Sequence, residues 1–385
     1  MKENIKIYYK KIDLLIILTM TILISIGLFC TRQAFKSSDE LDSIFIKQIA
    51  GIVIGYVMIF VIVFIDYHII CSLSIVLYVI MMAVLAFTLI FGQNVNNVKR
   101  WIVIFGIQFQ PSELTKVVLI LFLAFLCNHF KNKLNKLYVL FILAAVVALP
   151  IILIILEPHL SSCLAILFIF CIMVYASGIS YKVIGTAVAL ILPVAAGILI
   201  GAALFHIDIP FIENYQINRV LTFISTDESE NLDGDYQQLQ AVSAMGSGGL
   251  HGKMMSTEDD KNREYQLIYA KESDFVFTIV GEEFGFIGSF FIVICYIILI
   301  IRCLIISFRA PDYMGKLICM GVSSYLMFQI FVNISVATKL LPNTGLPLPF
   351  VSYGLTSLIS SMFAIGLVLN IGARQPYRMK DLDRF

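Results

Sequence analysis

The sequence has few charged residues and almost no net charge. Charged side chains make up 14% of the 385 residues, and 27 Lys and Arg nearly balance 26 Asp and Glu. Without an excess of basic residues the chain shows no sign of nucleic-acid binding, and we expect no nucleic acid among its partners. So little charge, beside 59% apolar residues, excludes an ordinary soluble domain and predicts an integral membrane protein.

The sequence patterns of several other protein classes are also missing. The eight cysteines form no CxxC pair and no Cys/His spacing, so they indicate neither a disulfide framework nor a metal site. No nucleotide-binding glycine loop is present, which argues against ATP-driven chemistry. No soluble domain or repeat interrupts residues 1–385, which we treat as one polytopic membrane domain. The first apolar run lacks a cleavage site and is expected to be a retained span.

Ten apolar runs of membrane-spanning length fill the chain. Lys and Arg precede the first run, follow the last and occupy alternate connections, which predicts that both termini are cytoplasmic. Residues 206–273 then form a large extracellular loop between spans seven and eight. We predict an all-α integral membrane protein of about ten transmembrane helices, with spans near 13–31, 45–66, 68–92, 112–128, 137–156, 160–178, 183–205, 275–301, 312–335 and 350–372.

Three acids lie at the start of the eighth run. Asp274 precedes it, and a helix over 275–301 would put Glu282 and Glu283 roughly 12 Å further along the axis. Ionised side chains at that depth cost several kcal/mol unless they are paired or wetted, so we expect an aqueous site facing all three. The alternative is that Asp274 caps the helix and the glutamates favour its positive end.

A second polar group leads into the fourth run. Pro111 suits the first turn of a helix, and Glu113 and Lys116, three residues apart, are neighbours on one helix face. One interpretation is a self-neutralised pair that lets the helix insert. The other is that Arg100 and Lys116 offer positive charge to an anionic ligand.

Two connections carry further candidates. Glu157 ends an apolar run, whereas His159 fits a plain helix-breaking turn. The glycines at 246, 248, 249 and 252 either let backbone approach a ligand or mark a flexible external loop.

A proline-rich stretch separates the last two runs. Pro342, Pro347 and Pro349 fall within eight residues of an apolar segment, which excludes a regular helix there. Non-helical backbone at membrane depth survives only against protein or a water-filled cavity. A broken or re-entrant segment beside a helix start is a common way for membrane proteins to build a site.

These polar stretches contain motifs in a definite order. One reads Arg-Trp-(x)8-Gln-Pro-Ser-Glu-x-x-Lys and spans 100–116; another reads Asn-(x)8-Pro-x-Thr-Gly-x-Pro-Leu-Pro-Phe-x-Ser-Tyr-Gly and spans 333–354. Between them lie Tyr-Gln at 236–237, Gly-Ser-Gly-Gly at 246–249, Ser-Asp-Phe at 273–275 and Gly-Glu-Glu at 281–283. Together they resemble the signatures of the SEDS family (shape, elongation, division and sporulation), which includes RodA, FtsW and SpoVE.

The resemblance implies a peptidoglycan glycosyltransferase of the bacterial cytoplasmic membrane. Such an enzyme polymerises lipid II on the outer face and releases undecaprenyl pyrophosphate. Asp274 matches the family's catalytic aspartate, and Arg219 matches its upstream arginine. The family is expected to work with a class B penicillin-binding protein, which cross-links the strands, and with other elongasome or divisome proteins among membrane lipid. His159, Lys339 and Leu355 depart from the common pattern, and the motifs leave open whether the role is in elongation, division or sporulation.

The chemistry implied by the resemblance assigns roles to particular residues. Asp274 would take the proton of the attacking sugar hydroxyl as a general base. Arg100, Lys116 and Arg219 would balance the departing pyrophosphate, and Glu113 and Ser352 complete the expected substrate-binding set. A divalent cation, Mg or Mn, would take most of its ligands from pyrophosphate and water, so no metal-binding residue is assigned. Two alternatives remain: a lipid II flippase without chemistry, and a non-catalytic scaffold of the cell-wall machinery.

Overall fold

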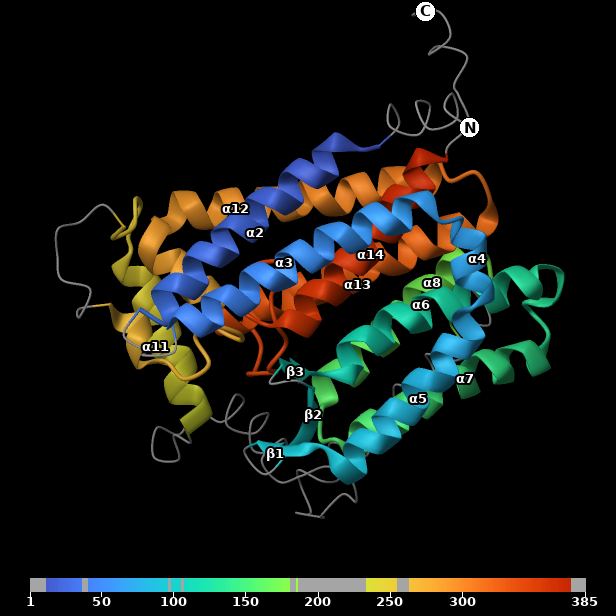
Figure 1. Ribbon diagram of the computed structural model, residues 1–385, viewed down its shortest axis with the longest axis horizontal. Helices are drawn as coiled ribbons and strands as arrows, with labels where there is room; N and C mark the ends of the chain where they lie inside the picture. Colours follow the sequence, from blue (N-terminus) through green and yellow to red (C-terminus); the bar gives the residue numbers. More distant parts are fainter. Residues whose placement is uncertain are drawn as a thin grey trace, which may run out of the picture.

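The computed structural model describes residues 12–36, 41–95, 98–104, 107–180, 185, 233–254 and 263–374, which form a mainly helical protein (Figure 1). The long helices are α2 (Leu14–Ala34), α3 (Leu41–Phe64), α5 (Ser74–Phe91), α6 (Pro111–His129), α7 (Leu137–Leu156), α12 (Val276–Phe308), α13 (Tyr313–Ala337) and α14 (Leu355–Ala373). The shorter elements are α4 (Tyr67–Ser72), α8 (Leu160–Ala176), α11 (Asp233–Ser247), η1 (Lys131–Lys133), η4 (Glu264–Leu267), β1 (Gln93–Val95), β2 (Val98–Ile104) and β3 (Ile107–Phe109).

The helices confirm the predicted fold class. Eight are long and apolar enough to cross a membrane, and α8 is a shorter apolar helix. Every predicted span except the seventh coincides with a helix, although the third is divided into α4 and α5 at Leu73. The seventh span, at 183–205, lies outside the described residues, as do both termini.

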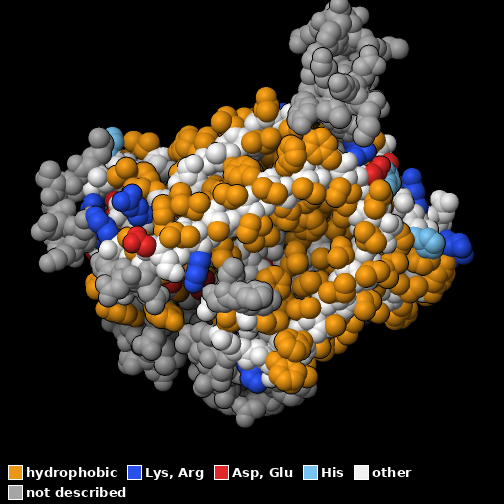
Figure 2. Space-filling view, in the orientation of Figure 1, with side chains coloured by type: hydrophobic (Ala, Val, Ile, Leu, Met, Phe, Trp, Pro, Cys, Tyr) orange, Lys and Arg blue, Asp and Glu red, His pale blue; other side chains and the backbone are white. Residues whose placement is uncertain are grey.

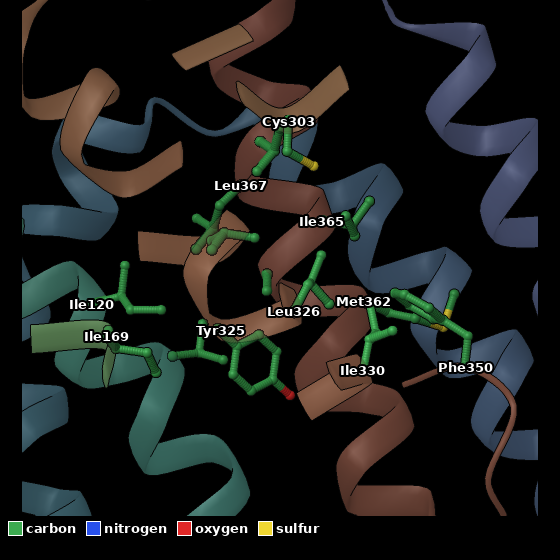
Figure 3. Packing of buried hydrophobic residues seen from close by; sticks show 14 of the residues in the cluster. Ile120, Ile169, Cys303, Tyr325, Leu326, Ile330, Phe350, Met362, Ile365 and Leu367 are labelled. Carbon is green, nitrogen blue, oxygen red and sulfur yellow. The ribbon is translucent and has the colours of Figure 1, made fainter. Parts of the chain in front are cut away.

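Burial separates the central helices from those at the periphery. Side chains of α6, α13 and α14 are mostly buried, and α14 packs against α3, α6 and α13. Leucine, isoleucine and aromatic side chains of α3, α5 and α7 are exposed instead, as expected where lipid is the solvent. Figure 2 shows these apolar side chains across the middle of one face, with charged ones gathered toward its ends. Figure 3 shows the central packing, where α6, α8, α13 and α14 contribute Ile120, Ile169, Tyr325, Leu326, Ile330, Met362, Ile365 and Leu367.

A small sheet replaces part of the predicted polar connection at 93–111. Strands β1, β2 and β3 form an antiparallel sheet in that order, with Ile102 paired to Phe109 and Ile104 to Ile107. The β-branched residues at 102–104 favour extended structure, but the run is too short to give a clear two-residue period. Arg100 lies on β2. Strand β3 is followed closely by Pro111, which is the first residue of α6, as predicted.

The proline-rich stretch contains no regular helix, as the three prolines predict. The last helix begins at Leu355 and not at 350. Phe350 and Gly354 have φ of 68° and 158°, conformations that a right-handed helix excludes. We call residues 338–354 the broken segment. It lies between α13 and α14 and reaches the residues that precede α12.

Candidate functional site

Asp274 lies in the turn before α12 and is half-buried. Its amide donates to the carbonyl of Ala270 (3.1 Å). The N-cap of α12 is Phe275, whose side chain forms no capping hydrogen bond. Asp274 is therefore not the N-cap residue of α12, as the alternative interpretation had it.

The broken segment packs against this acid. A Cβ added to Gly345 would lie 3.4 Å from Asp274 Oδ2, so the carboxylate runs along the backbone of the segment. Asn333 of α13 donates from Nδ2 to the carbonyl of Asp274 (3.0 Å) and to that of Leu346 (2.7 Å). One amide thus fixes both the acid and the segment beside it.

Ser352 joins the same two stretches from within the protein. Its side chain is buried, and the hydroxyl donates to the carbonyl of Ser273 (2.6 Å) while accepting from the amide of Leu348 (2.8 Å). The amide of Tyr353 donates to the carbonyl of Glu272 (2.8 Å). Ser352 therefore lies next to Asp274, as a support for the backbone that carries the acid.

Glu113 and Lys116 form a buried ion pair in the first turn of α6. Lys116 Nζ lies 2.7 Å from Glu113 Oε1, and both side chains are buried. Gln329 Nε2 donates to Glu113 Oε2 (3.1 Å), and Lys116 Nζ lies 5.6 Å from the centre of the Tyr325 ring. This is the geometry of the self-neutralised pair. Gln329 is one helical turn from Asn333, so one face of α13 holds both this pair and Asp274.

Arg100 reaches from β2 to the turn between α7 and α8. Its Nε donates to the carbonyl of Glu157 (2.9 Å), and its terminal nitrogen donates to that of Pro158. The next residues connect this corner to the broken segment, because the hydroxyl of Ser161 donates to the carbonyl of Thr344, which precedes Gly345. A continuous set of contacts therefore connects Arg100, through the turn before Ser161, to the part of the broken segment beside Asp274.

The Glu157 side chain is buried at the same corner. Neither carboxylate oxygen has a hydrogen-bond partner among the described residues. Burial raises the pKa of Glu157 to about 8, against the opposing effect of the Arg100 charge. His159 is also buried, which lowers its pKa, and its Nδ1 lies 3.0 Å from Ser162 Oγ. Burial therefore favours the uncharged form of both residues.

The expectation that Glu282 and Glu283 face an aqueous site with Asp274 is wrong. Both are fully buried in α12. Glu282 pairs with Lys253 (2.8 Å) and accepts the amides of residues 264 and 265 (3.0 and 2.9 Å). Glu283 accepts from the hydroxyl of Tyr265 (2.8 Å) and lies 3.1 Å from Arg263 Nε. The spacing of Lys253 and Arg263 along the chain gave no sign of these contacts.

Glycines at 248 and 252, in the stretch that follows α11, serve the same attachment to α12. A Cβ on Gly248 would lie 2.2 Å from the carbonyl of Gly281, and one on Gly252 would lie 2.1 Å from that of Glu283. Gly285 has φ of 67° and interrupts the helical geometry of α12 where the segment crosses it. At 248, 252 and 285 glycine allows backbone to approach backbone, whereas Gly246 and Gly249 have open space around them.

The structure thus gathers Asp274, Ser352 and the broken segment, with Arg100 linked through Ser161. Glu113 and Lys116 lie behind them in the helical core. Arg219 lies outside the described residues. Sequence reasoning did not assign roles to Asn333 or Gln329. Asn333 is the first residue of the motif at 333–354, whereas only the polarity of an amide within an apolar helix pointed to Gln329.

The chain resembles known proteins over most of its length. The family model described as cell cycle protein, covering FtsW, RodA and SpoVE, matches residues 8–377. The probable peptidoglycan glycosyltransferase FtsW of Geobacter sulfurreducens is 31% identical over 74% of this chain and 72% of its own. Stage V sporulation protein E of Bacillus subtilis is 29% identical over 95% of this chain and 98% of its own.

A solved structure has the same fold. It belongs to a peptidoglycan synthase complex that coordinates polymerisation and crosslinking, with a TM-score of 0.77, 24% identity, and coverage of 95% of this chain and 99% of that one. The protein is a member of the FtsW, RodA and SpoVE family of cell cycle proteins, which is the SEDS family.

Proposed function

We propose that this protein is a peptidoglycan glycosyltransferase that polymerises lipid II into glycan strands and releases undecaprenyl pyrophosphate. The family membership and the name carried by the Geobacter relative support the activity. One observation carries the assignment of the site: Asp274 is half-buried, its backbone is held by Asn333, and its carboxylate lies along the broken segment. An acid fixed in this way at the end of a membrane helix suits a lipid-linked sugar.

Asp274 acts as the general base. The 4-hydroxyl oxygen of one sugar attacks the anomeric carbon of another, and the bond from that carbon to the pyrophosphate oxygen breaks. The carboxylate takes the hydroxyl proton as the new bond forms, a contribution of about 10²–10⁴ in rate. Pyrophosphate leaves as a stable anion, so one base suffices and the anomeric centre inverts, as in other direct displacements at a sugar.

Positive charge on the pyrophosphate side comes from Arg100, with Arg219 as a second candidate. Arg100 already binds two backbone carbonyls at the corner linked to Asp274 through Ser161. We assign Glu113, Lys116 and Ser352 to positioning, because their polar atoms are bound within the protein. A divalent cation would use pyrophosphate and water as ligands; within the described ranges no three His, Cys, Asp or Glu side chains gather that could hold one.

The reaction takes place on the outer face of the cytoplasmic membrane, with both termini inside. Arg302 and Arg309 lie at the end of α12 opposite Asp274, and basic residues favour the cytoplasmic side. The synthase complex of similar fold coordinates polymerisation with crosslinking. We therefore propose a class B penicillin-binding protein as partner, within the elongation or division machinery.

The decisive test is polymerisation of lipid II by the purified protein with its partner present. Asp274→Asn keeps the side-chain shape and should lower the rate about 10²–10⁴-fold while size-exclusion behaviour stays normal. Asp42→Asn, which changes an exposed acid in the first turn of α3, serves as the control and should leave the rate unchanged. Wild-type glycan formation by the Asp274 variant would refute the base assignment.

The same assay separates the enzyme from the two alternatives. Glycan product formed in detergent, where no membrane divides two compartments, requires chemistry and excludes a pure flippase. A scaffold would tolerate Asp274→Asn in cells, so complementation by that variant would favour the scaffold.

A further inference from the structure

The helix ends furthest from Asp274 enclose a hollow of about 380 Å³. It lies among the start of α2, the end of α12 and the end of α14, three helices whose ends adjoin in Figure 1. The lining includes Asp13 and Leu14 of the α2 start, Arg302, Ile305 and Arg309 of the α12 end, and Gly372. No part of the proposed reaction uses this hollow.

Asp13 is fully occupied by the protein. Its Oδ2 accepts from Arg302 Nε and Nη2 (2.9 and 2.5 Å). Its Oδ1 accepts the amides of Leu15 and Ile16 at the start of α2 (3.2 and 3.3 Å). The pair joins α2 to α12 and leaves Asp13 no capacity to neutralise a further cation.

Arg309 supplies that further cation. It is exposed, lies seven residues after Arg302 on α12, and forms no side-chain hydrogen bond or ion pair within the described ranges. Seven residues are nearly two helical turns, so the two arginines share one side of the helix. The hollow therefore holds two guanidinium groups against one carboxylate, and an anion of single charge would balance it.

Apolar surface continues from the charged lining along α2. Leu14 is 75% exposed and Leu18, one turn further, is 57% exposed. Ile305 and Ile306 extend the apolar lining from α12. Arginines at the end of a membrane span, next to an exposed apolar helix face, match a molecule with a phosphate at one end and hydrocarbon at the other.

We propose that this hollow binds an anionic phospholipid of the surrounding leaflet, with its phosphodiester at Arg309 and Arg302 and an acyl chain along α2. A free phosphate would use the arginines and leave the leucines unused. A zwitterionic phospholipid would bring its own cation toward Arg309. The site is independent of the glycosyltransferase reaction.

A second basic hollow at the same end of the molecule provides a matched control. It measures about 300 Å³ and is lined by Lys131, Lys133 and Lys136, with Leu134 as the only aliphatic side chain among its lining residues. It offers more positive charge and little hydrocarbon surface. If charge alone determined lipid binding, this hollow would be the stronger site.

Native mass spectrometry of the full-length protein in detergent, titrated with phosphatidylglycerol, phosphatidylcholine or inorganic phosphate, tests the proposal. We expect phosphatidylglycerol to bind more tightly than phosphatidylcholine, and Arg309→Gln to weaken its binding about five-fold, while Lys133→Gln does not. Ile305→Trp, which fills the hollow and keeps both arginines, should also reduce binding; thermal unfolding checks that each variant is folded. Equal binding of the two lipids, an equal loss in the Lys133 variant, or displacement of the lipid by equimolar phosphate would overturn the proposal.

Discussion

Asn333 holds Asp274 through its backbone: the side-chain amide of the one donates to the carbonyl of the other at 3.0 Å. The same amide donates to Leu346 in the broken segment. Asn333 therefore links helix α13, the broken segment and the proposed base, and Ser352 adds a second link between the segment and the stretch that carries the base. Displacement of any of the three would move the carboxylate relative to a bound sugar.

Asn333→Ala should consequently lower both stability and activity. Two carbonyls lose their donor, at a cost of about 1–3 kcal/mol in the free energy of unfolding. Lipid II polymerisation by the folded fraction should fall at least ten-fold because the base is no longer fixed. Asn370→Ala is the matched control, since Asn370 is a buried amide that donates to the carbonyls of Ile62 and Ile65 elsewhere in the bundle. It should cost similar stability and leave the activity per folded molecule unchanged.

Variants of the buried Glu113–Lys116 pair can show whether these two side chains only support the fold or also contact the substrate. Lys116→Met leaves an uncompensated buried carboxylate and should cost about 3–5 kcal/mol. Combining it with Glu113→Gln removes that charge and should restore most of the stability, measured by thermal unfolding in detergent. We expect the double variant to polymerise lipid II. A well-folded double variant without product would mean that the pair contacts substrate.

The close approach of residues 248–252 to α12 predicts different effects for two neighbouring glycines. Gly248→Ala would place a methyl group 2.2 Å from the carbonyl of Gly281, so the segment must move away. Gly246 in α11 has open space around it, and alanine there should be neutral or slightly stabilising. Limited proteolysis of the 233–267 region should be faster in Gly248→Ala than in wild type, and unchanged in Gly246→Ala. Equal cleavage of the two variants would contradict the packing described here.

The raised pKa of Glu157 predicts a pH-dependent stability. Between its ordinary value of 4.5 and about 8, the unfolded chain releases this proton while the folded protein keeps it, so stability falls as pH rises. Glu157→Gln should remove this part of the dependence, which makes the variant more stable than wild type at pH 8 and similar at pH 4.5. Thermal unfolding across this range measures the difference. A wild-type slope in the variant would show that Glu157 is ionised in the fold.

The sequence was most informative where a single physical rule governs a whole segment. Apolar length identifies a membrane span because lipid cannot satisfy exposed backbone groups. Every predicted span within the described residues coincides with helical structure, although the third is divided into α4 and α5. Three prolines excluded a helix from the broken segment for an equally local reason. The sheet at 93–109 was missed because its strands are short and pair only with one another.

The sequence did not show which polar side chains contact one another in the folded protein. Asp274 stood out by its position before a span, yet its orientation depends on Asn333 and Gly345, which lie 59 and 71 residues away along the chain. Glu282 and Glu283 appeared to be companions of Asp274 and are instead bound to Lys253, Arg263 and Tyr265. The membrane class, the spans and the family motifs follow from the order of residues alone, because hydrophobicity and proline geometry act locally. Which acids are neutralised, and which one lies along the broken segment, depends on the folded arrangement, because a buried charge is stabilised by whichever group folding brings within about 3 Å of it.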